Sequence, residues 1–280
     1  MLVRELLPPI CYRLLQRFRR PAGMIEDPAF SGDYAAWADA AVLSSGYDQP
    51  AILEKVRQAA LAVKHGNAAF ERDSVTFAEP ATNWPVLASL MSLAALAGGS
   101  LHVVDFGGSL GSLYFQHRVF LDQLRDVSWT VVEQPHFVRI GQTELADGRL
   151  KFADCIPETC PSGSTTGLIL SSVLQYLPDP HDVLRSLLKN SWQGVILDRT
   201  AFVSTRPSDR LTVQRVPAEI YSASYPAWFF SPGSLEKHFQ ERFTETARWI
   251  CDDDYSLDQD QGSSEGRLFL ARQFTESHNQ

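Results

Sequence analysis

Apolar residues recur at helical spacing along the first third of the chain. Three segments show this spacing, at 34–43, 50–63 and 85–97. Pro50 suits the first position of the second helix, and Gly66 suits its end. The pattern therefore predicts that residues 30–97 are helical.

From Leu101 onwards, short apolar and β-branched runs alternate with amphipathic segments. The runs are typical of buried strands and lie at 102–105, 129–133, 150–152, 168–170 and 194–198. Strands that alternate with helices imply a mostly parallel sheet with helices on both faces. Two further runs, at 246–250 and 267–271, predict an antiparallel hairpin at the sheet edge. The predicted fold class is therefore α/β, with a Rossmann-like sheet.

The change of pattern near residue 100 divides the chain into two predicted parts. Residues 1–99 form a helical N-terminal region, and residues 100–280 form the Rossmann-like domain. Within the second part, the segment at about 199–230 is too long for a plain connector, and it is rich in aromatic residues and arginines. We predict that this segment is a lid over a bound substrate. A later loop, 252–260, contains five aspartates and is either solvated or able to bind a cation.

Composition excludes some classes of function. The chain is 44% hydrophobic and 21% charged, and its formal net charge is -8. It therefore lacks the basic footprint that nucleic-acid binding leaves. The four cysteines have no spacing typical of a zinc or redox site, so we predict reduced thiols, no metal and a cytoplasmic protein. No apolar run approaches the roughly 18–20 residues that span a bilayer.

The first 20 residues are unusually basic, with five arginines against a single acid, Glu5. Leucines and other apolar residues lie between them. Two interpretations fit this segment: a short amphipathic helix on the anionic surface of the inner membrane, which would make the protein peripheral, or a terminal helix packed on the domain.

The most informative motif is the run Val103-Val-Asp-Phe-Gly-Gly-Ser-Leu-Gly111. A strand ends in an acid, Asp105, and a turn containing Gly107, Gly108 and Gly111 opens the next helix. Glycines let a backbone approach a ligand closely. The run fails the NAD fingerprint, because serines stand where the second and third glycines are required, and it also lacks the lysine of a phosphate loop.

Further polar residues follow the other predicted strands. Ligands of such sheets bind beyond the carboxyl ends of the strands. Glu133 ends the second strand and can accept hydrogen bonds from both hydroxyls of a ribose, with Gln134 beside it. Asp154, after the third strand, could meet an adenine amino group. The loop after the fourth strand carries the last two cofactor-binding candidates, Ser171 and Gln175.

In order, these elements resemble the class I S-adenosylmethionine (SAM)-dependent methyltransferases. That family has an acid-x-Gly turn after strand one, acids after strands two and three, a Leu-x-Tyr/His-Leu loop after strand four, and a final antiparallel hairpin. The resemblance covers about residues 100–272. It implies that SAM is the cofactor, that the chain transfers a methyl group, and that Tyr176 lies beside the sulfonium.

A closer resemblance is to a small group of bacterial proteins regarded as methyltransferases and often encoded near surface-polysaccharide genes. The matching segments are 71–74, 105–112, 132–136, 170–176, 198–200 and 225–230. This likeness implies a saccharide, a glycolipid or another small molecule as the methyl acceptor, with a hydroxyl as one possible target atom.

Acceptor-binding and catalytic residues are predicted around the lid. The substrate-binding candidates are Arg72, Asp73, Arg199, Tyr221 and Tyr225. Aromatic faces can pack against sugar rings, and arginine can clamp a carboxylate or phosphate. Methyl transfer to a hydroxyl needs a base near the acceptor oxygen.

The candidates for that catalytic role are Asp198, His136 and Tyr176. Two structural alternatives stay open: an ion pair of Asp198 with Arg199, and an ion pair of Arg72 with Asp73.

Two other functions are compatible with the sequence. One is an NAD-dependent sugar-modifying enzyme, although the missing glycines count against it. The other is a non-catalytic protein with a methyltransferase-like fold that serves as a binding protein. The intact Asp105, Gly107 and Glu133 argue for a working cofactor site but say little about catalysis.

Overall fold

The computed structural model describes residues 29–45, 50–156, 166–216, 223–253 and 255–275. The basic segment 1–20 and Tyr221 lie outside these residues. Within the described part, no helix is both long and apolar enough to cross a membrane.

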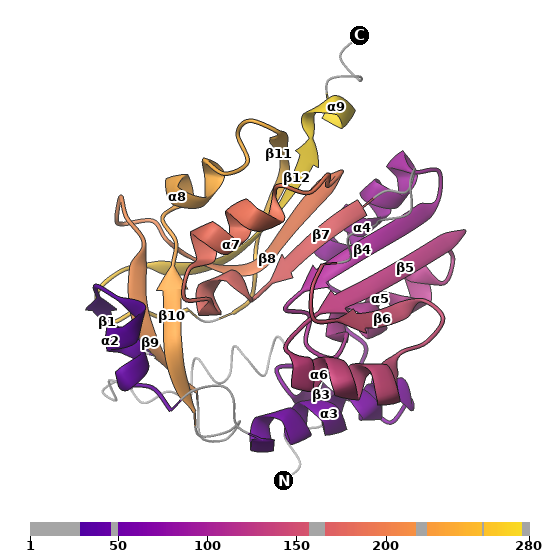
Figure 1. Ribbon diagram of the computed structural model, residues 1–280, viewed down its shortest axis with the longest axis horizontal. Helices are drawn as coiled ribbons and strands as arrows, with labels where there is room; N and C mark the ends of the chain where they lie inside the picture. The colour runs from indigo at the N-terminus through magenta and orange to yellow at the C-terminus, as the bar shows by residue number, and fades with distance from the viewer. Residues whose placement is uncertain (1–28, 46–49, 157–165, 217–222, 254, 276–280) are drawn as a thin grey trace.

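A seven-stranded sheet forms the centre of the molecule, with the order β11-β12-β8-β7-β4-β5-β6 (Figure 1). Its strands are β4 (Ser100–Phe106), β5 (Asp126–Val132), β6 (Leu150–Ala153), β7 (Thr166–Ser171), β8 (Gly194–Val203), β11 (Phe243–Ile250) and β12 (Gly262–Ala271). The strands β4 to β8 are parallel to one another, and β12 and β11 continue the sheet in antiparallel fashion. The predicted parallel sheet and C-terminal hairpin are confirmed.

Helices cover both faces of this sheet. Neighbouring residues of each strand point to opposite sides, so each face has its own apolar side chains to bury. Val103 belongs to a core cluster under the helices α3 to α6, whereas Val104 belongs to a second cluster under α7 and α8. The helical elements are α3 (Pro50–Lys64), α4 (Trp84–Leu96), α5 (Ser112–Leu121), α6 (Pro135–Ile140), η1 (Gly141–Leu145), η2 (Leu174–Tyr176), α7 (Pro180–Leu187), α8 (Pro232–Glu236) and α9 (Arg272–Thr275). The helices α3 and α4 precede residue 100; α4 packs directly on β4, β7 and β8, whereas α3 packs on α5 and η1.

The N-terminal region contains strands that helical spacing did not predict. The predicted helices are present as α2 (Trp37–Val42), α3 and α4, but β1 (Phe30–Tyr34), β2 (Phe70–Arg72) and β3 (Val75–Phe77) interrupt them. The prediction that all of residues 30–97 are helical is therefore wrong in these places. The stacked rings of Phe70 and Phe77, with centroids 4.5 Å apart, hold β2 and β3 together as a hairpin.

The segment predicted as a lid contributes to a second, smaller sheet. The segment 199–230 contains the second part of β8 and the strands β9 (Arg210–Arg215) and β10 (Ser224–Phe229). These two strands pair with β1 in the order β1-β9-β10, seen at the left of Figure 1. A bridge between Phe202 and Phe230 joins the small sheet to the extension of β8. The small sheet is thus held against the end of the central sheet.

The aspartate-rich loop before β12 is fixed by arginines. The buried Arg210 pairs with Asp258 and Asp260 and also donates to the carbonyl of Gly32 in β1. Asp260 accepts a further hydrogen bond from Thr205 at 2.8 Å. These aspartates act as anchors for the loop, which corrects the expectation that they are simply solvated.

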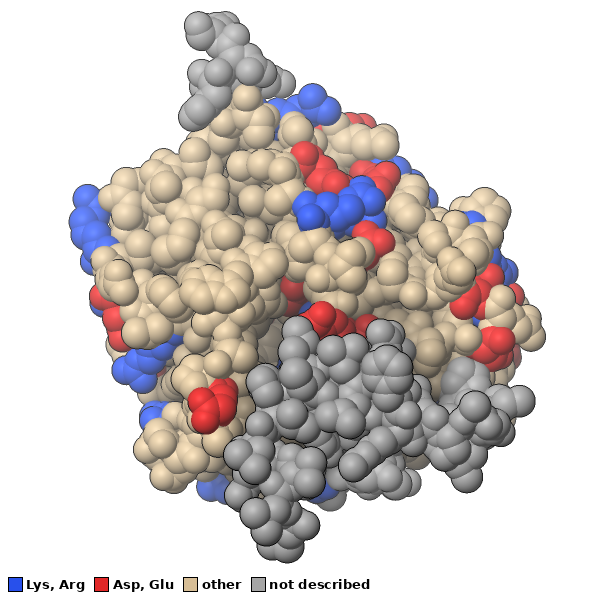
Figure 2. Space-filling view, turned by 180° about the vertical axis from the view of Figure 1, so that it is seen from behind, with Lys and Arg blue, Asp and Glu red and all other residues tan. Residues whose placement is uncertain are grey.

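Surface charge on the face shown in Figure 2 is mixed, with Lys and Arg side chains scattered among Asp and Glu. No broad basic area dominates the described part of this face. This arrangement agrees with the acidic net charge of -8.

Candidate functional site

The turn after β4 forms the floor of the candidate site. Gly107 and Gly111 have φ angles of +73° and +88°, in the left-handed region that favours glycine. The Gly107 amide donates to the carbonyl of Val132, at the end of β5. A Cβ on Gly107 would lie 2.3 Å from Cγ2 of Val173 in the loop after β7. The turn therefore passes too close to its neighbours for any larger residue.

Asp105 lies directly beneath this turn and is fully buried. A Cβ on Gly108 would come within 2.4 Å of the Asp105 carboxylate. Trp129 Nε1 donates to Oδ2 at 3.2 Å, but Oδ1 has no partner among the described residues. Burial raises the pKa of Asp105 to about 7. A cation bound beside Oδ1 would favour the ionised carboxylate.

Glu133 follows β5 and faces the same turn. Its Oε1 accepts a hydrogen bond from the Ser109 amide at 3.3 Å, and its Oε2 accepts one from the Gln134 amide at 2.8 Å. Burial raises the pKa of Glu133. Each carboxylate oxygen has a second lone pair, so the group can still accept hydrogen bonds from a diol.

The remaining predicted cofactor residues lie along the same edge of the sheet. Asp154 follows β6 beside Glu133, since the Glu133 amide donates to the carbonyl of Ala153. Gln134 and Asp154 are exposed. Gln175 instead is buried and its Nε2 donates to the carbonyl of Arg199 at 3.0 Å, while its Oε1 has no partner in the described part of the chain. Gln175 therefore ties the loop after β7 to β8.

Asp198 is enclosed by four donors and fully buried. Its Oδ2 accepts from Asn83 Nδ2 at 3.1 Å and Ser171 Oγ at 2.9 Å, and its Oδ1 accepts from Trp249 Nε1 at 3.1 Å and Cys251 Sγ at 3.6 Å. The hydroxyl of Ser171, a predicted cofactor-binding residue, therefore already donates to Asp198. The carboxylate joins the start of α4, the end of β7 and the end of β11.

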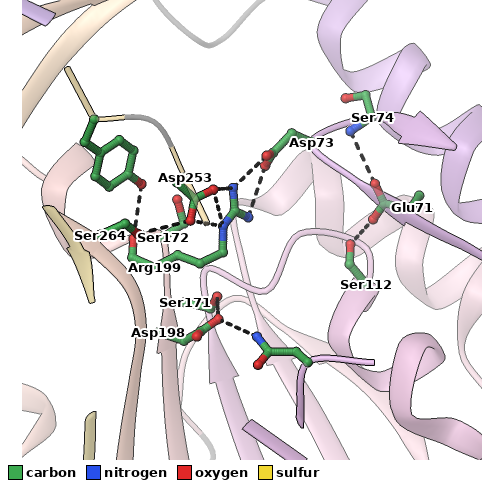
Figure 3. Close-up of polar contacts among 12 residues, drawn as sticks. Glu71, Asp73, Ser74, Ser112, Ser171, Ser172, Asp198, Arg199, Asp253 and Ser264 are labelled. Atoms are coloured by element: carbon green, nitrogen blue, oxygen red, sulfur yellow. Dashed lines mark hydrogen bonds and ion pairs between the residues drawn. The ribbon is translucent and has the colours of Figure 1, made fainter. Parts of the chain in front are cut away.

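Arg199 pairs with two other carboxylates, so the alternative of an Asp198–Arg199 ion pair is wrong. Its Nη2 lies 2.7 Å from Oδ2 of Asp73 and 2.9 Å from Oδ1 of Asp253 (Figure 3). Asp253 also accepts from Ser264 Oγ at 3.0 Å. Burial opposes ionisation of Asp253, yet Arg199 lowers its pKa. These contacts join β8, the hairpin β2-β3 and the loop after β11.

A β-bulge directs Arg199 toward these partners. Leu197 pairs with Arg267, and Thr200 pairs with Glu265, so Asp198 and Arg199 together lie opposite the single residue Gly266. Such bulges re-aim side chains and are frequent beside active sites. The bulge therefore turns Arg199 away from the direction that regular pairing would give it.

Glu71 holds the other side of the hairpin. It is buried, accepts a hydrogen bond from the Ser74 amide at 3.2 Å, and makes a close contact with Ser112 Oγ in the first turn of α5 (Figure 3). Burial raises the pKa of Glu71. The hairpin thus bridges the start of α5 and β8. From this hairpin, Asp73 pairs with Arg199. The expected alternative of an Arg72–Asp73 ion pair is therefore wrong. Arg72 instead helps to lower the pKa of Asp253.

Backbone strain gathers in this part of the molecule. The described non-glycine residues with positive φ are Asp73, Ser74, Ser109, Ser172 and Arg199. Asp73 and Ser74 form the tip of the hairpin β2-β3, Ser109 lies in the glycine turn, Ser172 follows β7, and Arg199 lies at the bulge in β8. Left-handed conformations cost such residues about 1–3 kcal/mol each, and they concentrate at functional sites.

Three tyrosines line the boundary between the two sheets. The Tyr176 hydroxyl donates to Gln214 Oε1 at 3.0 Å, and its ring meets Tyr225 edge-on at 5.3 Å. Burial raises the pKa of Tyr176 well above its usual value. Tyr255, which the sequence analysis missed, donates from its hydroxyl to the carbonyl of Arg199 at 3.2 Å.

The three predicted catalytic residues are not brought together. His136 lies in the first turn of α6, after β5, whereas Asp198 lies in β8. The strands β4 and β7 separate β5 from β8. Asn83, Trp249 and Cys251, which surround Asp198, were also missed. Only Asn83 had a local feature, because Asn followed by Trp-Pro is typical of a helix start.

No protein-family model matches this sequence, and no curated protein matches it. Solved structures that resemble the chain include the magnesium protoporphyrin IX methyltransferase ChlM from Synechocystis with bound SAM. The two chains are 13% identical with a TM-score of 0.43, and the match covers 67% of this chain and 78% of that one. A SAM-dependent methyltransferase from Methanosarcina mazei matches at 11% identity and a TM-score of 0.45, covering 68% and 98%.

A third is the 1,6-didemethyltoxoflavin-N1-methyltransferase from Burkholderia thailandensis, with bound 1,6-didemethyltoxoflavin and S-adenosylhomocysteine. It matches at 15% identity and a TM-score of 0.39, covering 81% of this chain and 92% of that one. At these identities and TM-scores, the likeness carries no conclusion about the cofactor or activity of this chain.

Proposed function

We propose that the chain is a SAM-dependent methyltransferase. The observation that carries the proposal is the contact between the glycine turn after β4 and the Glu133 carboxylate after β5. A carboxylate beside this turn would suit the hydroxyls of a ribose, next to a backbone of glycines that allows close approach. The turn ends without the lysine that a phosphate loop would supply. This chemistry suits an adenosine cofactor without a pyrophosphate.

The residues present fit SAM on a second ground, the Oδ1 of the buried Asp105, which has no partner among the described residues. An ammonium group would complete this buried acceptor and favour its ionised form. Glu133 would hold the ribose hydroxyls, and Asp154 would meet the adenine amino group. When bound, the cofactor supplies a methyl group already activated on a sulfonium.

The proposed acceptor is a saccharide, a glycolipid or another small molecule of surface-polysaccharide synthesis, and the proposed target is a hydroxyl. Tyr176 and Tyr225, at the boundary of the two sheets, offer aromatic edges and faces to a sugar ring. We further propose that the protein works in the cytoplasm, where its basic N-terminal segment would permit contact with the inner membrane. A nucleic-acid partner is not proposed.

Acid–base catalysis has a small part in this proposal. Four donors enclose Asp198, and Tyr176 keeps its proton because burial raises its pKa. The oxygens of Asp198 are therefore already engaged and Tyr176 is protonated, so neither suits the role of the base. His136 is the remaining candidate. Orienting the acceptor against an activated donor can by itself supply several kcal/mol, and the proposal rests mainly on that contribution.

Transfer of labelled methyl groups tests the proposal. The protein is incubated with SAM labelled in its methyl group and with bacterial cell-envelope extract, and incorporation of label into the extract is measured. Label should appear with the wild type and with Glu144→Ala, which changes a remote carboxylate that pairs with Arg57. It should fall strongly with Glu133→Ala.

Equal transfer by Glu133→Ala would contradict the assigned cofactor site. SAM binding without transfer to any extract would favour the non-catalytic binding protein. Binding of NAD in place of SAM would favour the sugar-modifying enzyme.

A further inference from the structure

The two carboxylates on Arg199 are held in very different ways. Asp253 meets Nε and Nη2, is only 10% exposed in its side chain, and is fixed from behind by Ser264. Asp73 meets Nη1 and Nη2 from the opposite side, and its side chain is 55% exposed. The inner carboxylate, Asp253, is therefore held in place by its neighbours, whereas water and solutes can reach the outer one, Asp73.

The position of Asp73 is also strained. Asp73 and Ser74 have φ angles of 52° and 68° at the tip of the hairpin β2-β3. A two-residue turn with positive φ at both positions strongly prefers Asn-Gly or a similar pair. Aspartate suits the first of these positions, whereas serine stands in place of the preferred glycine at the second, and from this turn the Asp73 carboxylate reaches the guanidinium.

Charge balance favours an anion in that outer position. Arg199 and Arg72 both interact electrostatically with Asp253, and both lower its pKa. If Asp73 moved out, Arg199 and Arg72 would face the ionised Asp253 and the buried Glu71, whose raised pKa favours its neutral form. An incoming oxyanion would restore the balance and could use the same planar pair of N–H donors.

The location agrees with the acceptor side of the proposed site. Arg199 lies at the bulge within β8, level with the end of β7, and its carbonyl accepts from both Gln175 and Tyr255. Figure 3 shows its side chain reaching across from β8 to the hairpin, above Ser171 and Asp198. A ligand group on Arg199 would therefore lie over the β7–β8 part of the sheet, beside the cofactor floor at β4 and β5.

We propose that Arg199 anchors an oxyanion of the methyl acceptor, either a carboxylate or a phosphate, and that Asp73 occupies its place until the acceptor binds. The inference deepens the proposed function, on which it rests for the identity of the ligand as a methyl acceptor. It narrows the acceptor to an anionic class, such as a sugar acid or a sugar phosphate. It also makes Asp73 a competitor of the substrate, which is a property that a purely structural ion pair lacks.

Side-chain NMR of arginine tests this directly. The Nε–Hε resonance of Arg199, identified by its loss in Arg199→Gln, is followed while sodium phosphate or sodium acetate is added at constant ionic strength. The two anions distinguish a phosphate site from a carboxylate site. The variants are Asp73→Asn, whose asparagine tolerates the left-handed turn, and the matched control Asp33→Asn. Asp33 is similarly exposed, at 51%, and pairs with Arg206 at 2.6 Å in the small sheet.

Asp73→Asn should bind at least one of the anions about two- to sixfold more tightly than the wild type, which is the factor expected when an exposed ion pair stops competing. Asp33→Asn should match the wild type. The inference is overturned if neither anion shifts the Arg199 resonance in Asp73→Asn, if Asp73→Asn binds no more tightly than the wild type, or if the control gains equally.

S-adenosylhomocysteine added to the same samples tests the proposed function separately. Shifts of the Ser109 and Gln134 amides support the cofactor site whatever the anions do. Anion binding without any such shift would leave the Arg199 site standing and remove the methyltransferase assignment.

Discussion

The two halves of the candidate site are built by different means. The half proposed to bind the cofactor, the cofactor half, consists of the glycine turn after β4 and the acid that follows the adjacent β5. The half proposed to bind the acceptor, the acceptor half, consists of the side chains of Asp73, Arg199 and Asp253, which come from a hairpin, a bulged strand and a distant loop. The first half depends on backbone conformation, and the second depends on tertiary contacts.

The halves also differ in how well their polar groups are satisfied. In the described part of the chain, Asp105 carries an oxygen without a partner beneath the turn, so the cofactor half can still take a donor or a cation. Arg199 is bound on both sides by carboxylates, so the acceptor half is already balanced. A ligand should therefore complete the cofactor half, whereas it must displace a side chain in the acceptor half.

The largest effect is expected from Gly107→Ala. The new Cβ would lie 2.3 Å from Val173 Cγ2, and the residue would have to keep a φ of +73°. The turn should therefore shift, and affinity for S-adenosylhomocysteine should fall by about 100-fold, or about 2.8 kcal/mol. Calorimetric titration measures this change.

Gly148→Ala is the matched control, because nothing lies within 4 Å of the added Cβ. It should leave the affinity unchanged. Binding by Gly107→Ala within threefold of the wild type would mean that the cofactor does not approach this turn.

A smaller effect should appear in the pH dependence of cofactor binding. Burial raises the pKa of Asp105 to about 7, and a bound cation favours its ionised form. Affinity for S-adenosylhomocysteine should rise about tenfold between pH 6 and 8 and then level off. Asp105→Asn should flatten this rise.

The sign for stability without cofactor is the opposite. Because the folded pKa of Asp105 exceeds its unfolded value, its favourable contribution is complete below about pH 4 and is lost as the pH rises through 7. Asp105→Asn should remove this loss in urea titrations without ligand. An unchanged pH profile of binding in Asp105→Asn would separate Asp105 from the cofactor.

The free energy of unfolding should distinguish the two carboxylates of the acceptor half. Asp253→Asn removes a buried charge from Arg199 and should lower the free energy of unfolding by about 1.5–3 kcal/mol. Asp73→Asn removes an exposed one and should cost less than about 1 kcal/mol. Urea denaturation at pH 7 measures both. Equal losses would show that Asp253 and Asp73 do not differ as a fixed and an exchangeable partner of Arg199.

The same contrast explains what the sequence could predict. Strands β4 to β8 and the acids at their ends follow local rules: apolar β-branched runs, glycines where φ is positive, and an acid at a strand end. Asp105, Gly107 and Glu133 were therefore placed correctly at the carboxyl edge of the sheet. Their roles toward a cofactor stay predictions.

The acceptor half could not be predicted in this way, because its contacts join residues far apart in the chain. Phe30 pairs with Gln214 in the small sheet, and no local pattern marks either residue as a partner of the other. Asp253 lies in an aspartate-rich loop whose arginine partners come from β8 and β9. Helical spacing around residue 72 gave no indication that Asp73 would meet Arg199.

The central claim is that the turn after β4 and Glu133 bind the adenosine part of SAM and do not bind NAD. Calorimetric titration of S-adenosylhomocysteine and of NAD into the wild type, Glu133→Ala and Glu144→Ala tests it most directly. The account predicts that S-adenosylhomocysteine binds to the wild type and to Glu144→Ala, that Glu133→Ala weakens it by about 1.5–3 kcal/mol, or roughly 10- to 150-fold, and that NAD gives no heat. Unchanged affinity in a folded Glu133→Ala, or binding of NAD in place of S-adenosylhomocysteine, would contradict it.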